Sequence, residues 1–248
     1  MSVPKAFREA VEKAKAAGRP GDLRLLSWEI HDLDWAEEGQ FLAAQAKLDI
    51  DGPIPPGRVL LFTGHMIDAP GRLEPRFPPE QEKVARDAIG KAIANDREIA
   101  GKARLGIAGA ASGGDILFHE VCGELGIPTH VYLPMDREDF LDSSVRKAGG
   151  DWEQRFDQLL ASRQVVQLGA SKELPSWLAG KEGYDFWQRN NQWLLQNAFA
   201  ESGDNVTLIA LWDHKEGDGP GGTGHLVQEA LSRGASPQVY DTRELFEL

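Results

Sequence analysis

The sequence predicts an α/β fold: a Rossmann-like, doubly wound and mainly parallel sheet with helices on both faces, plus an N-terminal helical appendage. Two observations predict it. From residue 58 onward, short apolar runs alternate with helical patterns of ten or more residues, which is typical of a parallel sheet covered on both sides. Before residue 50, the sequence carries helical patterns only.

The N-terminal part predicts two or three helices. In "PKAFREAVEKAKAAG", apolar and small residues recur at helical spacing until Gly18 ends the pattern. Residues 22 to 50 give one or two further helices, with Asp22 placed as the cap. The following "DGPIPPGR" contains three prolines and two glycines and marks a boundary. We therefore expect a helical appendage over 1–52, or the end of a helical array, and a Rossmann-like domain over 58–248.

The elements of the second part follow in order. Strands are expected at 58–62, 103–110, 128–134, 163–169, 205–213 and 236–241, and helices at 79–101, 116–126, 151–162, 184–202 and 225–234. In such a sheet, ligands bind beyond the carboxyl ends of the strands.

Composition narrows the range of partners. The chain has 248 residues and a formal net charge of −12, with no dense run of Lys or Arg, so we expect no long nucleic acid as a partner. The apolar runs are too short to cross a bilayer, and residues 1–18 lack the apolar core of a secretory signal. The single cysteine, Cys122, fits a reducing compartment. We expect a cytoplasmic protein with no membrane partner.

Glycine-rich loops follow three of the predicted strands. They are "TGHMIDAPGRLEPRFP", "GAASGGD" and "GDGPGGTGHLVQEA". Because carboxyl ends of parallel strands share one edge, the three loops meet there. Glycine lets a backbone approach a phosphate closely, and amides at a helix start supply the positive end. The pattern is neither a P-loop nor the dinucleotide fingerprint. It predicts binding of a small phosphorylated ligand.

Several side chains in these loops have two interpretations. His65 faces a ligand or bonds its neighbours in the turn. Asp115 binds a ribose hydroxyl or acts as a base, or it is a first-turn acid favoured by the helix dipole. Of the arginines in the first loop, Arg76 is the phosphate candidate, whereas Arg72 is expected in solvent. His119 and Glu120 do not complete a His-Glu-x-x-His pattern, so no metal site is expected.

The helix "YDFWQRNNQWLLQNAFA" carries asparagines in an apolar setting. Asparagine is a mediocre helix former, and buried amides need hydrogen-bond partners. For Asn191 the partner is a ligand's base or ribose, or else the backbone of a neighbouring loop.

The third loop carries a family resemblance. "PGGTGHLVQE" resembles the Pro-Gly-Gly-x-Gly-Thr-x-x-Glu motif of the LOG family, Rossmann-like nucleotide monophosphate phosphoribohydrolases. It is also similar to the wider superfamily that includes DprA-type proteins and the ligand-sensing SLOG domains of bacterial signalling and defence systems. The segments at 59–78 and 109–134 resemble the version joined to tetratricopeptide-type repeats or cyclase modules. The resemblance covers roughly 58–241.

The resemblance implies a nucleotide site with retained binding and lost or altered hydrolysis. The family holds the ligand phosphate on the glycine loop, which here includes Pro220, with its glutamate near the ribose and an arginine on the preceding helix. Here His225 replaces the threonine, and Glu229 comes one residue late, a rotation of about 100° on a helix. Arg189 lies on the corresponding helix. These departures fall on the catalytic residues and favour binding over catalysis.

The sequence therefore leads to two functional hypotheses. One is a sensor of a phosphorylated nucleotide in bacterial signalling or defence, which acts on a helical-repeat or effector module, as a single chain or as a homo-oligomer. The alternative is an enzyme that cleaves an N-glycosidic bond, a phosphoribohydrolase or a deoxyribosyltransferase relative. No cofactor is expected. The ligand-binding candidates are Thr63, Gly64, His65, Arg76, Ser112, Gly113, Gly114, Asp115, Asn191, Pro220, Gly221, Gly222, Thr223, Gly224 and His225; the catalytic candidates are Glu229, Asp115 and Arg189.

Overall fold

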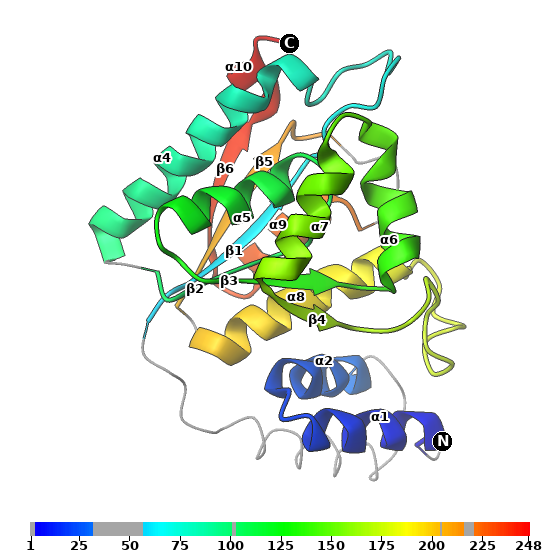
Figure 1. Cartoon of the computed structure of the whole chain (residues 1–248). Coiled ribbons are helices and arrows are strands. Elements are labelled where there is room, and N and C mark those ends of the chain that lie inside the picture. Colours follow the sequence, from blue (N-terminus) through cyan, green and yellow to red (C-terminus); the bar gives the residue numbers. More distant parts are fainter. Residues whose placement is uncertain (1–2, 32–56, 101–102, 204, 216–220) are drawn as a thin grey trace.

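The fold is a single parallel sheet between helical layers (Figure 1). The computed structural model describes residues 3–31, 57–100, 103–203, 205–215 and 221–248. Within them, six strands pair in the order β4-β3-β2-β1-β5-β6, and every pairing is parallel. The predicted Rossmann-like α/β class is confirmed.

The strands lie where the apolar runs predict them. Their bounds are β1 Val59–Gly64, β2 Leu105–Ala108, β3 Thr129–Leu133, β4 Gln164–Gln167, β5 Val206–Trp212 and β6 Ser236–Asp241. β1 and β5 occupy the centre, in register from Val59 opposite Val206 to Gly64 opposite Leu211. Their side chains are almost wholly buried because both faces of the sheet are covered.

Alternation along the strands divides the core into two halves. Leu60 and Phe62 of β1 pack on one face, and Val59 and Leu61 on the other. The first face is covered by α4 Glu82–Ala100, α5 Gly114–Glu124, α6 Arg137–Ser144, α7 Trp152–Ser162 and α10 Thr242–Phe246. The second is covered by α8 Phe186–Ser202 and α9 Thr223–Ser232. Short 3₁₀ helices span Pro79–Gln81 and Arg146–Ala148.

Two N-terminal helices form a further layer outside α8 (Figure 1). They are α1 Lys5–Ala16 and α2 Pro20–His31. Near Gly21 the two backbones approach so closely that a Cβ atom would lie 2.7 Å from Cα of Asn197. At the other end of α2, Glu29 pairs with Arg189. Helix α2 therefore runs antiparallel to α8 along much of its length.

The expected helix pattern over 32–50 lies outside the described residues, and within 3–31 the structure differs from the sequence expectation at Asp22. Asp22 was expected to cap a helix that begins after it, but α2 begins at Pro20 and Asp22 lies in its first turn. Its carboxylate accepts a hydrogen bond of 2.7 Å from the Trp193 indole and pairs with Arg19. Burial raises the pKa of Asp22 despite these partners. The side chain thus fastens α2 to α8.

Candidate functional site

The reversal of strand order lies between β1 and β5. From β1 the chain winds through β2 and β3 to β4, and it then crosses to β5 on the opposite side of β1. The loops leaving the carboxyl ends of these two strands consequently turn in opposite directions, and such a reversal is the usual ligand position in an open α/β sheet. His65 directly follows β1, and Asp213 directly follows β5.

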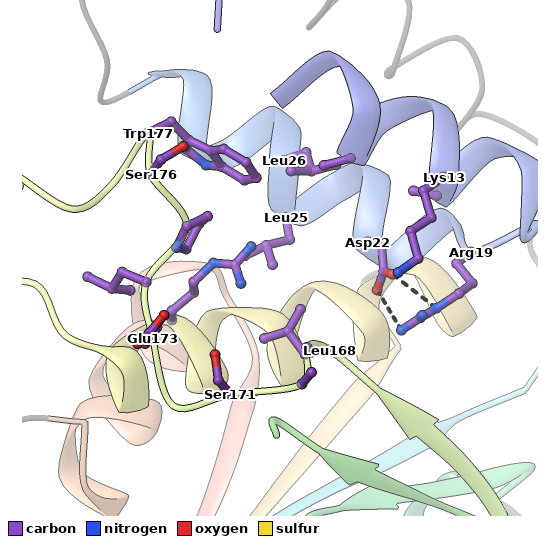
Figure 2. Close-up of a pocket in the computed structure, with 17 residues that line it drawn as sticks. Lys13, Arg19, Asp22, Leu25, Leu26, Leu168, Ser171, Glu173, Ser176 and Trp177 are labelled. Carbon is purple, nitrogen blue, oxygen red and sulfur yellow. Dashed lines mark hydrogen bonds and ion pairs between the residues drawn. The ribbon is translucent and has the colours of Figure 1, made fainter. Parts of the chain in front are cut away.

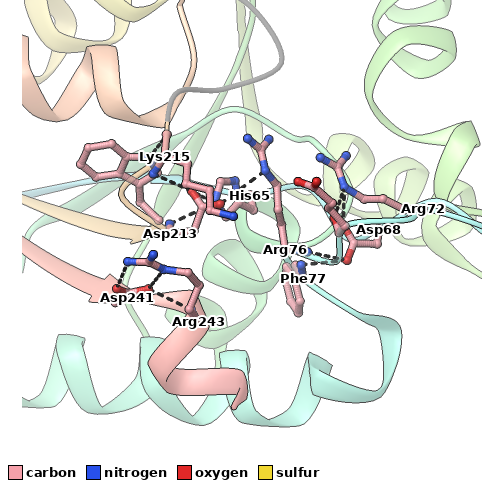
Figure 3. A network of polar contacts seen from close by, with 11 residues as sticks. His65, Asp68, Arg72, Arg76, Phe77, Asp213, Lys215, Asp241 and Arg243 are labelled. Atoms are coloured by element: carbon pink, nitrogen blue, oxygen red, sulfur yellow. Dashed lines mark hydrogen bonds and ion pairs between the residues drawn. The ribbon is translucent and has the colours of Figure 1, made fainter. Parts of the chain in front are cut away.

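His65 and Asp213 meet at this reversal (Figure 3). The Nε2 atom of His65 lies 3.1 Å from Oδ1 of Asp213 and 3.2 Å from its backbone nitrogen. Burial lowers the pKa of His65, although Asp213 acts in the opposite direction. Burial also disfavours the charged form of Asp213, but the Lys215 amide, His65 and Arg76 outweigh it and lower the pKa of Asp213. Asp213 is therefore an anion fixed among positive and donor groups.

Cationic side chains gather around this pair. Arg76 places Nε 3.5 Å from Oδ2 of Asp213. Arg243, which follows β6, pairs with Asp241 at 2.9 Å (Figure 3), and Asp241 together with the charge of Asp213 raises the pKa of Arg243. This local collection contrasts with the formal net charge of −12 for the whole chain. Each of these arginines faces a carboxylate, Asp213 or Asp241, so a bound anion would compete with these ion pairs for the guanidinium donors.

Asp68 holds the first glycine-rich loop in shape. Its Oδ2 atom accepts hydrogen bonds from the backbone nitrogens of Arg76 at 2.9 Å and Phe77 at 3.0 Å. Its Oδ1 atom lies 3.4 Å from Nε of Arg72, the arginine expected in solvent. The loop between these anchors is exposed, including Leu73 at its tip. Arg76 is thus fixed at its backbone and carries its guanidinium to Asp213.

The second glycine-rich loop packs directly on the first. The nitrogen of Ile67 donates to the carbonyl of Ser112, and that of Gly114 donates to the carbonyl of His65. Gly113 has a φ of 97°, and a Cβ atom there would lie 2.4 Å from the nitrogen of Ile67. Glycine is required for both reasons. The predicted meeting of these two loops at one edge is thereby observed.

Asp115 stands at the start of α5 with a nearly free carboxyl group. Its only hydrogen bond within the described residues comes from the Ala111 nitrogen, 3.2 Å from Oδ2. Desolvation raises the pKa of Asp115 to about 7, and this single amide does not compensate. A carboxyl group that titrates near neutrality at a ligand-facing edge can donate or accept a proton there.

The third glycine-rich loop leads into α9, and Pro220 lies outside the described residues. A Cβ atom on Gly221 would lie 2.5 Å from the backbone of Trp187 and Gln188, and one on Gly224 would lie 2.6 Å from the ring of Trp212. Gly222 is the N-cap residue of α9, and no side chain among the described residues caps this helix. Amides of an uncapped first turn are available to an anion. Thr223 is half-buried beside them.

The Asn191 side chain hydrogen-bonds to the backbone of this loop. Its Nδ2 atom donates to the carbonyls of Gly221 at 2.7 Å and Gly222 at 3.2 Å, and it lies 3.2 Å from Nδ1 of His225. This is the loop-backbone alternative of the sequence analysis. Desolvation lowers the pKa of His225, so its ring is held in the neutral form. Asn191 therefore shapes the start of α9.

Two of the three catalytic candidates point elsewhere. Glu229 accepts a hydrogen bond from the Gln192 side chain and lies 3.8 Å from Arg233. Arg189 donates from Nε to Oε1 of Glu29 at 2.8 Å, on the side of α8 that faces α2. Asn191 is two positions after Arg189, which is a rotation of about 200° on a helix. The structure brings neither side chain to the His65–Asp213 pair.

Thr63 and Gly64 end β1, and both are half-buried at the edge. Sequence reasoning missed Asp213 and Arg243 as members of the network. The available signal was the position of Asp213 immediately after the central strand "VTLIALW". Within the described residues, no group of three or more His, Cys, Asp and Glu side chains could hold a metal ion. No helix in the same residues is long and apolar enough to span a bilayer.

Known proteins give little further guidance. No protein-family model matches the chain, and no curated protein sequence does. Among solved structures, the chain is similar to the X-ray structure of DNA processing protein A (DprA) from Streptococcus pneumoniae, at 13% identity and a TM-score of 0.33. The similarity covers 77% of this chain and 62% of that chain, so it spans less than two thirds of DprA. The Rossmann-like class rests on this chain's own sheet order.

Proposed function

We propose that the protein binds a phosphorylated nucleotide, or a signal derived from one, at the carboxyl edge of β1 and β5. The network of Arg76, His65 and Asp213 at the strand reversal carries this proposal. Arg76 and the uncapped start of α9 supply donors for phosphate oxygens. In contrast, Asp136, Asp185 and Asp241 cap α6, α8 and α10, so those helix starts already hold an anionic group.

The proposed role is sensing in a bacterial signalling or defence system, as the resemblance to SLOG domains implies. The ligand would act through a helical-repeat or effector module, or through a second copy of the chain. The orientation of Glu229 toward Gln192 supports binding over hydrolysis, since a glutamate turned to α8 does not reach a sugar at the strand edge.

Asp115 favours a second candidate function. A carboxyl group with a pKa of about 7 suits proton transfer during cleavage of an N-glycosidic bond. In that reaction Asp115 would activate water or protonate the departing base. It would take the part that the resemblance assigns to Glu229.

Native mass spectrometry separates these functions. The full chain is mixed with nucleoside monophosphates, dinucleotides and cyclic nucleotides, and the same samples are assayed for free base. We expect an intact 1:1 adduct that Arg76→Gln weakens about tenfold or more, because a charge-assisted contact to phosphate is lost. Arg146→Gln, an exposed arginine on the opposite face of the sheet from α8, is the matched control and leaves the adduct unchanged.

The outcomes differ clearly. An adduct without free base supports the sensor. Free base that disappears in Asp115→Asn, with the adduct retained, establishes the enzyme. Absence of every adduct, or adducts equally strong in Arg76→Gln, contradicts a nucleotide site at this edge.

A further inference from the structure

A cavity of about 450 Å³ lies away from the strand reversal, between the N-terminal helices and the main body (Figure 2). Its walls come from α1, α2, the segment after β4 and the first turn of α8. Leu25, Leu26, Leu168 and Trp177 give it apolar surface. Lys13, Arg19 and Asp22 stand at one end in Figure 2, and Trp177 stands at the other. A volume of this size suits a small organic molecule.

Arg189 lines this cavity with a guanidinium group that is only partly used. Its side chain is 11% exposed, and Nε donates to Glu29, which is 0% exposed. The second oxygen of Glu29 accepts from the Trp177 indole at 2.9 Å. Within the described residues, the hydrogen bonds of the Arg189 side chain come from Nε alone. The two terminal nitrogens are therefore left for a group inside the cavity.

Such an arrangement selects for an anion with two oxygen atoms side by side. With Nε held by Glu29, the opposite edge of the guanidinium presents two parallel N–H donors, which match a carboxylate or phosphate in a bidentate contact. Lys13 adds a second cation at the cavity, without a partner among the described residues. Arg19 is already occupied by Asp22 and the carbonyl of Gln167.

We propose that this cavity binds a small organic anion, with its carboxylate or phosphate on Arg189 and its apolar body against Trp177 and Leu25. The inference does not depend on the proposed nucleotide site, since Arg189 and Asn191 face different sides of α8. It also assigns a ligand-binding role to the two terminal nitrogens of Arg189, which the contact with Glu29 does not use. An occupant would touch α1, α2 and the segment after β4 together, and it would hold the N-terminal helices on the body.

Calorimetric titration of the full chain tests this proposal. The probes are benzoate and phenyl phosphate, which share an aromatic body but carry different anions, and benzyl alcohol as the neutral control. We expect at least one anion to bind at 1:1 and benzyl alcohol to bind about tenfold more weakly or not at all, because it lacks the bidentate contact. The stronger of the two anions identifies the source chemistry.

Variants locate the binding. Ser171→Phe adds bulk at an exposed position of the cavity wall, and Arg189→Lys retains a cation for Glu29 but loses the two-donor edge. Both are expected to weaken binding about tenfold or more, and Lys13→Gln less. Lys91→Gln, on the exposed face of α4, is the matched control and changes nothing.

Amide hydrogen exchange distinguishes binding in this cavity from binding at the strand reversal. Bound benzoate should slow amide hydrogen exchange in 5–16 and 169–177, and Arg76→Gln should leave that protection intact. The proposal is overturned if neither anion binds, if benzyl alcohol binds as well as the anions, or if Ser171→Phe leaves the titration unchanged.

Discussion

Asp115 has an electrostatic cost at neutral pH that its surroundings do not offset. Its pKa of about 7 compares with an ordinary value of 3.8, so the folded state binds the proton more tightly than the unfolded state. The free energy of unfolding therefore falls as pH rises from about 4 to about 7. His119, buried with a pKa lowered to about 4 from 6.5 by desolvation, acts in the opposite direction across an overlapping range.

Asp115→Asn isolates the first of these effects. Asparagine keeps an oxygen for the Ala111 amide but cannot ionise. Relative to the unchanged protein, we expect the variant to gain about 1 kcal/mol or more of unfolding free energy between pH 4 and pH 7.5, a figure reduced for partial exposure. Urea unfolding at both pH values measures it. Asp139→Asn, at an exposed position, is the control. A difference that does not vary with pH contradicts the raised pKa.

Residues of the site differ in how far the sequence predicts them. Thr63 lies at the end of β1, and His65 and Ser112 follow apolar strands; a parallel sheet brings such positions to one edge, so pattern alone places them. The partner of Arg189 could not be predicted in this way. Glu29 lies 160 positions away in the chain, and no local pattern relates the two. The partner of His65 was missed for the same reason, since Asp213 is 148 positions away.

At the scale of elements, hydrophobic periodicity predicts the long helices and central strands but not the short pieces. Helices α6 and α10, of 8 and 5 residues, were not predicted. One or two turns give too little periodicity to distinguish a helix from a polar loop. Tertiary contacts stabilise such short helices. For example, Phe246 of α10 stacks on Phe77 with ring centroids 5.1 Å apart.

Gly113 ties two elements together and gives a sharp test of the edge geometry. A Cβ atom at this position meets the backbone of Ile67, and the φ of 97° disfavours any other residue. We expect Gly113→Ala to lower the free energy of unfolding by about 2 kcal/mol or more and to weaken nucleotide binding. Urea unfolding of the variant measures the stability change.

Gly90→Ala is the matched control for that change. Gly90 lies inside α4, where a Cβ atom would meet the nearest heavy atom at 3.9 Å. Alanine is the better helix former, so we expect a gain of about 0.5 to 1 kcal/mol. Equal effects of the two substitutions would contradict a strained turn at Gly113.

For the molecule as a whole, α2 belongs to the core as much as to the N-terminal helices. Leu25 joins the cluster formed by α8, α9 and one face of the sheet, and Trp28 packs against it. Residues on the other side of α2, with α1, form a separate cluster around Phe7. Asp22 and Glu29 add polar contacts to Trp193 and Arg189. Removing the helices would expose apolar surface of α8 and two polar groups whose partners lie in α2.

The boundary predicted near residue 52 therefore raises the question of how much the N-terminal helices stabilise residues 58–248. We predict that residues 58–248 alone are less stable than the full chain by several kcal/mol, since buried leucine-sized contacts contribute about 2 kcal/mol each. That corresponds to a melting temperature lower by about 10 °C, measured by circular dichroism. Full-length Glu29→Gln should show part of the decrease, because it weakens one of the same contacts. Equal melting temperatures for the fragment and the full chain would mean that the N-terminal helices are an independent appendage.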